Sequence, residues 1–101
     1  MMKEDVIQEI GIDDEERLYV KPSSSKFPMM YREAIEVHWD KDNSYLYGEK
    51  PRKWSYLDWF KQIVSGAEIQ GTKLNINNDT QWVNVPNDLQ QQISELQNVG
   101  T

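Results

Sequence analysis

His38 is the only histidine in this chain of 101 residues, and it is the side chain best suited to acid–base chemistry. Asp40 follows two residues later, and side chains two positions apart on a strand share one face. A histidine and a carboxylate placed in this way can act as a general base. A small enzyme that uses His38 with a carboxylate such as Asp40 is therefore one hypothesis, although we favour a protein that is not an enzyme.

Other kinds of catalytic and metal site find no support in the residue types. One histidine and no cysteine exclude a site of several histidines, a thiolate metal site and a cysteine nucleophile. The sequence has no Gly-x-Ser-x-Gly elbow, phosphate-binding glycine loop or dinucleotide fingerprint. We expect no catalytic residue, no metal site and no cofactor.

Aromatic side chains are concentrated in the middle of the chain. Seven of the eleven lie between residues 39 and 60. They predict either a small core built from large side chains or a patch for a partner, a second subunit or a flat or cationic ligand. Our candidate binding residues are Trp39, Tyr45, Tyr47, Trp54 and Tyr56.

The negative charge is concentrated at the beginning of the chain. The net charge is −6, and residues 1–16 alone hold seven acids against one base. The four consecutive acids at 13–16 predict a solvated turn, with an acidic patch for a basic partner as the alternative. Because such a field repels phosphate backbones, we expect no nucleic-acid partner.

We expect neither a membrane partner nor export. No apolar run approaches the ~20 residues of a membrane span, and the first residues lack a basic region followed by an apolar stretch. These features predict a cytoplasmic protein.

The candidate residues must be positioned by short strands. Apolar and aromatic runs bounded by turn residues predict strands at 6–12, 17–21, 37–39, 45–47 and 72–77, with a further one at 81–85. The first four pair as two hairpins, and a short helix is the alternative for 6–12. Ile7 does not fit the alternating pattern of the first strand.

The clearest helix begins at Ser55. Ser55 and Asp58 predict a capping box, and Trp54 and Trp59 predict a hydrophobic staple around it. Apolar residues from 56 to 67 span more than half of the helix circumference, whereas packing on one sheet requires a stripe of about 100°. The apolar surface left over after packing on the sheet predicts a homo-oligomer, with a dimer as the first choice.

Two shorter helices complete the prediction. Pro28 precedes two expected turns of helix at 29–35, and a final helix opens at Pro86 with a narrow apolar stripe. We expect one α+β domain over residues 1–101, with a mostly antiparallel sheet of about four to five strands and two to three helices. Residues 1–16 form its acidic segment and the start of the first hairpin.

Three stretches, Val37–Asp40, Lys50–Ile63 and Thr80–Pro86, carry a resemblance to known proteins. Around them, over about residues 29–93, the sequence resembles a family of small bacterial proteins that includes integron gene-cassette proteins of the mobile metagenome. The resemblance implies a small α+β fold, a mobile-element origin and a tendency to oligomerise. It implies no activity and carries over no functional residue.

The main functional hypothesis is a non-enzymatic binding or interaction protein encoded on a mobile element. Its aromatic-rich surface would serve self-association or the binding of a protein or small ligand. Besides the small enzyme, the other alternative is an immunity or antitoxin-type protein that neutralises a basic partner.

Overall fold

The structure of this chain is a computed structural model, in which two hairpins form more than half of one sheet. It describes residues 3–27, 37–48 and 55–98. The hairpin strands are β1 (Lys3–Ile12), β2 (Leu18–Pro22), β3 (Val37–Asp40) and β4 (Tyr45–Gly48). The pairs β1–β2, β3–β4 and β2–β4 are all antiparallel, which confirms both hairpins and excludes a helix in the first segment.

A shift of register in β1 explains why Ile7 breaks the alternating pattern. The register against β2 shifts between Ile7 and Glu9, as at a β-bulge. A bulge adds one residue to one strand, so side chains on either side of it can point to the same face. Ile7 and Ile10 are consequently both fully buried.

Two further strands extend the sheet beside β1. These are β5 (Thr72–Asn75) and β6 (Gln81–Val83), and both run parallel to β1. The sheet order is β3-β4-β2-β1-β5, with β6 also paired to β1. The α+β class and the mostly antiparallel sheet are confirmed, and the described residues form six strands, one more than the upper end of the expected range.

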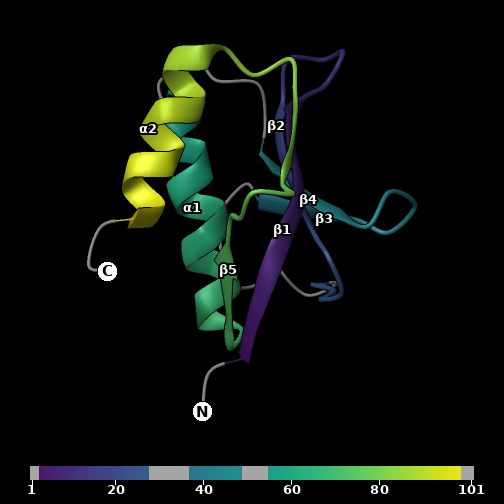
Figure 1. Ribbon diagram of the computed structural model, residues 1–101. Coiled ribbons are helices and arrows are strands. Elements are labelled where there is room, and N and C mark those ends of the chain that lie inside the picture. Colours follow the sequence, from purple (N-terminus) through teal and green to yellow (C-terminus); the bar gives the residue numbers. More distant parts are fainter. Residues whose placement is uncertain (1–2, 28–36, 49–54, 99–101) are drawn as a thin grey trace.

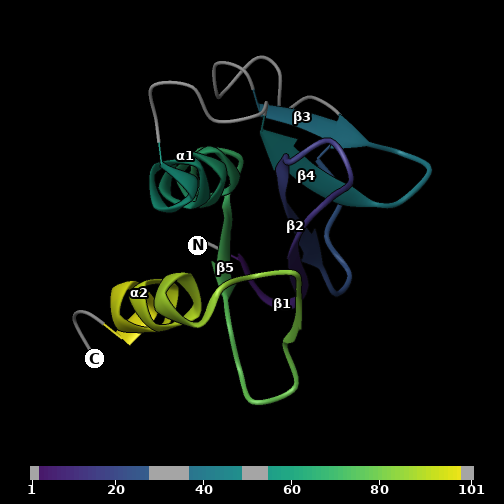
Figure 2. The same cartoon turned by 90° about the horizontal axis from the view of Figure 1, so that it is seen from above.

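Helices α1 (Tyr56–Ile69) and α2 (Asn87–Asn98) lie next to each other on the same side of the sheet (Figures 1 and 2). The predicted capping box is confirmed, because the Ser55 side chain accepts from the Asp58 amide and the Asp58 side chain accepts from the Ser55 amide. Trp54 and the helix expected at 29–35 lie outside the described residues. None of the helices in the described ranges is long and apolar enough to span a membrane.

The core fills the space between the helices and the sheet. α1 contributes the buried side chains of Trp59, Phe60 and Ile63, and α2 contributes its narrow stripe through Leu89 and Ile93. The Trp59 ring lies so close to β4 that a Cβ atom at Gly48 would overlap it. A residue without a side chain at this position lets the helix approach the sheet.

Candidate functional site

Four rings lie together on the sheet face opposite the helices. Leu18, Val20 and Leu46 are fully buried on the core side, so the residues alternating with them point the other way. The strand register places Tyr19 opposite Tyr47 and Tyr47 opposite His38. Together with Tyr45, these residues form what we call the aromatic face: Tyr19, Tyr45, Tyr47 and His38.

The rings of the aromatic face contact one another in sequence. Tyr19 stacks on Tyr45 with ring centroids 4.5 Å apart, and Tyr45 meets Tyr47 edge to face at 6.2 Å. The His38 ring lies 5.3 Å from that of Tyr47. The guanidinium carbon of Arg17 lies 4.5 Å from the centroid of Tyr47, within the range of a cation–π interaction.

Tyr19 anchors this face to β1. Its hydroxyl donates a hydrogen bond of 2.6 Å to the Glu9 carboxylate. Burial raises the pKa of Tyr19, and the Glu9 carboxylate raises it further because it accepts a hydrogen bond from the neutral phenol and its negative charge disfavours a phenolate. A Cβ atom at Gly11, the residue paired with Tyr19, would overlap the phenol ring. Because Gly11 has no side chain, the Tyr19 ring can occupy this space.

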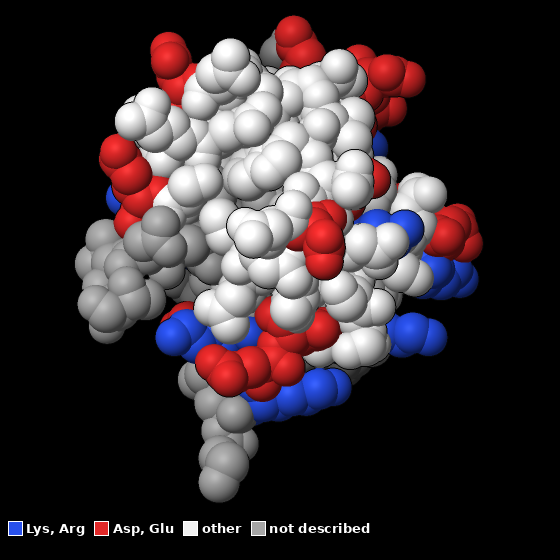
Figure 3. All heavy atoms as spheres, viewed as in Figure 1, with Lys and Arg blue, Asp and Glu red and all other residues white. Residues whose placement is uncertain are grey.

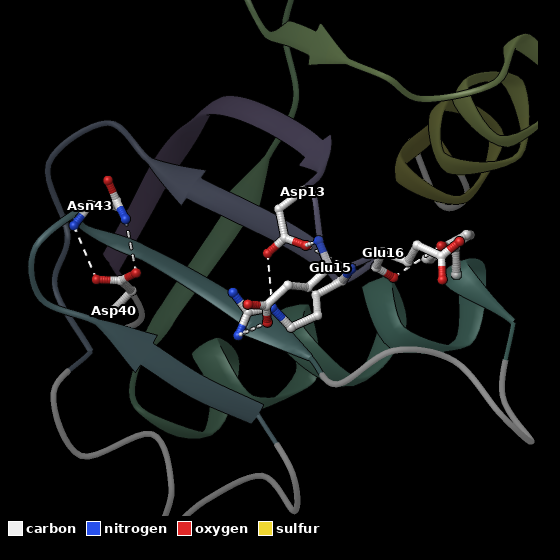
Figure 4. A network of polar contacts seen from close by, with 7 residues as sticks. Asp13, Glu15, Glu16, Asp40 and Asn43 are labelled. Carbon is white, nitrogen blue, oxygen red and sulfur yellow. Dashed lines mark hydrogen bonds and ion pairs between the residues drawn. The ribbon is translucent and has the colours of Figure 1, made fainter.

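The first hairpin turn places Arg17 between two acids and the aromatic face. Arg17 Nε donates to Asp13 Oδ2 at 2.8 Å, and its Nη1 lies 3.4 Å from Glu15 (Figure 4). Asp13 also accepts hydrogen bonds from the backbone amides of Glu15 and Arg17, both at 2.9 Å. The predicted turn at 13–16 is confirmed, and Asp13 organises it.

The second hairpin turn brings Asp40 to the same region. Its carboxylate accepts from the Asn43 side chain at 2.9 Å and from the amides of Asp42 and Asn43 (Figure 4). These hydrogen bonds lower the pKa of Asp40, and the bond from the Asn43 side chain contributes most. Slight desolvation acts in the opposite direction but is outweighed. Burial raises the pKa of Tyr45, and the negative charges of Asp40 and Asp13 raise it further. The neutral form of the Tyr45 phenol and the ionised form of the Asp40 carboxyl are therefore both favoured in this region.

The structure distributes the candidate binding residues over different surfaces. Tyr45 and Tyr47 belong to the aromatic face, whereas Trp39 lies on the core side, with its ring 6.0 Å from buried Phe27. Tyr56 lies at the start of α1, where its hydroxyl donates to the backbone oxygen of Glu16 at 3.0 Å. Trp54 lies outside the described residues.

Three residues of this region were not predicted from the sequence: Tyr19, Arg17 and Glu9. All come from the first hairpin, far along the chain from the aromatic-rich segment. A signal was present, because Tyr19 alternates with two apolar residues in an expected strand and must therefore face away from the core.

The two residues considered for acid–base chemistry each contact neighbours in their own hairpin. Asp40 binds its own turn, and His38 packs against Tyr47. Across the described segments, no group of three or more His, Cys, Asp or Glu side chains is arranged to hold a metal ion.

Comparisons with known proteins agree with the resemblance seen in the sequence. A family model described as Integron Cassette Protein Hfx_Cass5 matches residues 5–80. A solved structure of the integron cassette protein Hfx_Cass5, from the mobile metagenome of the North West Arm Sewage Outfall, is 42% identical to this chain. The match covers 94% of this chain and 96% of that one, with a TM-score of 0.50. No curated protein matches the sequence. The chain therefore belongs to the Hfx_Cass5 family of integron cassette proteins.

Proposed function

We propose that this protein is a non-enzymatic binding protein whose aromatic face takes a cationic segment of a protein partner. One observation carries the proposal: the guanidinium of Arg17 already lies over the ring of Tyr47, 4.5 Å from its centroid. The chain's own arginine thus illustrates the kind of group that these rings accept. Each such contact contributes about 0.5–1 kcal/mol when exposed and about 2 kcal/mol when water is excluded.

The charges around the rings support a cationic partner. Four carboxylates adjoin the aromatic face, and we call them the carboxylate rim: Glu9, Asp13, Glu15 and Asp40. Arg17 pairs with two of them, Asp13 and Glu15, so the acids outnumber the base around the rings. The neighbouring Asp14 and Glu16 are exposed at the turn and add to the negative field. Such a field speeds encounter with a basic partner and disfavours an acidic one.

A protein that neutralises a basic partner, as an immunity or antitoxin-type protein does, would use a surface of this kind. We propose a cytoplasmic setting for it. In the enzyme alternative, His38 would act with a carboxylate such as Asp40, whose oxygens accept hydrogen bonds within its own turn.

An NMR titration tests the proposal with a defined probe, a capped Arg-Gly-Arg-Gly-Arg peptide. We expect shifts at Tyr45, Tyr47 and His38, and weaker binding as salt screens the carboxylates. Tyr47→Ala should weaken binding about twofold to thirtyfold, the loss of one cation–π contact, whereas Tyr47→Phe should retain most of the affinity.

The matched controls are a Glu-Gly-Glu-Gly-Glu peptide, which should not bind, and Gln92→Ala, a substitution on the exposed side of α2. Equal binding of the arginine peptide to Tyr47→Ala and to the wild type would contradict the proposal. So would shifts confined to the turn at 13–16, because that pattern indicates attraction to the acids alone.

A further inference from the structure

Arg17 occupies the aromatic face in the way that a cation from a partner would. Its guanidinium carbon lies 4.5 Å from the centroid of the Tyr47 ring, its Nε donates to Asp13 at 2.8 Å, and its Nη1 lies 3.4 Å from Glu15. One side chain thus contacts both the ring and two acids of the carboxylate rim. A second guanidinium cannot take the same place while Arg17 remains there, because the two groups would overlap and repel each other.

The Arg17 guanidinium is held at the surface by contacts that water can reach. The side chain of Arg17 is 24% exposed, and that of Glu15 is 72% exposed. Cation–π contacts and ion pairs at such positions are weak, since water competes with them and salt screens them. The guanidinium can therefore leave the Tyr47 ring and return to it.

The turn that carries Arg17 is held by other bonds. Asp13 accepts hydrogen bonds from the backbone amides of Glu15 and Arg17, both at 2.9 Å. Two backbone bonds, from the Asp13 amide to the Arg17 carbonyl and from the Glu16 amide to the Asp13 carbonyl, close the turn at 3.0 Å each. Because none of these four bonds uses the guanidinium, its departure leaves the shape of the turn unchanged.

We propose that Arg17 is an internal competitor that regulates the binding of a cationic partner at the aromatic face. This competition rests on the proposed function, in which these rings take a cationic segment. When an arginine of the partner arrives, the Arg17 guanidinium leaves the Tyr47 ring, and the incoming group takes its place beside Asp13 and Glu15. A site that is open for only a fraction of the time has its affinity reduced by that fraction, so Arg17 lowers the affinity for every cation.

Such competition favours segments with several positive charges over isolated cations. A single arginine gains little, because it only replaces Arg17, whereas a longer basic segment also reaches Glu9 and Asp40 of the carboxylate rim. In Figure 3, acidic side chains gather at the upper right of the molecule, where Figure 1 shows the turn between β1 and β2. Residues 13–16 of this turn are all acids, and their field adds to the attraction of a basic segment.

The NMR titration with the capped Arg-Gly-Arg-Gly-Arg peptide tests the competition when it is repeated on Arg17→Gln. This variant should bind the peptide at least about threefold more tightly than the wild type, because the competing cation is gone. Lys61→Gln is the matched control, since it removes the same charge from an exposed position of α1, on the opposite side of the sheet. It should change the affinity by less than about twofold, because distant surface charges are screened by salt.

The wild type supplies a second measurement that needs no variant. In the free protein the Nε proton of Arg17 is bonded to Asp13, and the guanidinium lies over the Tyr47 ring. Both contacts displace its NMR resonance from that of an exposed arginine. As the peptide saturates the protein, this resonance should move to the position of an exposed arginine, because the guanidinium has left the ring.

The outcomes separate the competition from the proposed function. Equal binding to Arg17→Gln and to the wild type overturns the competition alone, as does an Arg17 Nε resonance that stays unchanged at saturation. A gain in Arg17→Gln no larger than that in Lys61→Gln overturns it too, because net charge then accounts for the effect. A peptide that binds neither the wild type nor Arg17→Gln overturns the proposed function and the competition with it. Circular dichroism melts establish that each variant is folded.

Discussion

Tyr19 occupies its position because Gly11, its partner across the β1–β2 pair, has no side chain. In Gly11→Ala the new methyl group would overlap the phenol ring and displace it from Glu9 and Tyr45. We expect a loss of about 1–3 kcal/mol in the free energy of unfolding, the usual cost of overpacking. Urea unfolding measures this loss, and near-ultraviolet circular dichroism should report the displaced tyrosine.

The control for this prediction is the same substitution in a chain whose ring has been removed. In a Tyr19→Ala background, Gly11→Ala should cost much less, because the methyl group then enters free space. An equal loss of unfolding free energy in both backgrounds would show that Gly11 is required for its backbone conformation, and not to make room for the Tyr19 ring.

His38 gives a second prediction for a single residue. His38→Ala should leave the protein folded, because the side chain is only half-buried, with its ring packed on that of Tyr47. Thermal melts should show a change of about 1 kcal/mol or less, typical of partly exposed positions. A complete loss of folding would mean that the imidazole holds the sheet together.

At the scale of the elements, two substitutions in and next to α1 compare how much helix capping and core packing each contribute to stability. Trp59→Ala should cost about 3–5 kcal/mol, since Trp59 is 3% exposed and packs against Gly48. Ser55→Ala should cost only about 1 kcal/mol, because it removes one bond of the capping box and no core volume. Urea unfolding of both variants should show this ranking, and the reverse ranking would contradict the assignment of Trp59 to the core.

For the molecule as a whole, the carboxylates determine how stability depends on pH. Asp5 is 9% exposed, and its oxygens accept from the amides of Ser24 and Ser25, 19 and 20 residues along the chain. Burial alone would raise the pKa of Asp5, but these hydrogen bonds lower it below its usual value of 3.8. A carboxyl whose pKa is lowered in the folded state stabilises fully above its unfolded pKa. That stabilisation is lost as the pH falls through the folded pKa.

We therefore expect the free energy of unfolding to fall as the pH drops below about 4. Asp5→Asn should lower stability at pH 7 by about 1–3 kcal/mol and flatten this acid dependence. Asp14→Asn is the matched control, because Asp14 is exposed in the turn, and it should change stability by less than about 0.5 kcal/mol. An acid dependence that is unchanged in Asp5→Asn would show that other groups dominate.

Much of the local structure can be predicted from short stretches of sequence. The box of Ser55 and Asp58, the acidic turn and both hairpins are confirmed, because hydrogen bonds and side-chain alternation between near neighbours determine them. The α+β class and the family also follow from such signals. The binding role of Tyr45 and Tyr47 remains a prediction.

Long-range pairing, by contrast, cannot be derived from local patterns. Alternation with a period of two shows that Tyr19 and Tyr47 each face away from buried neighbours, but it does not show that β2 and β4 are adjacent. The register that places these two rings opposite each other depends on how the whole sheet packs on α1 and α2. The same holds for β5 and β6, whose parallel pairing with β1 joins residues about 70 positions apart. Tyr19 and Tyr45 illustrate the limit, because their rings stack at 4.5 Å although they belong to different hairpins.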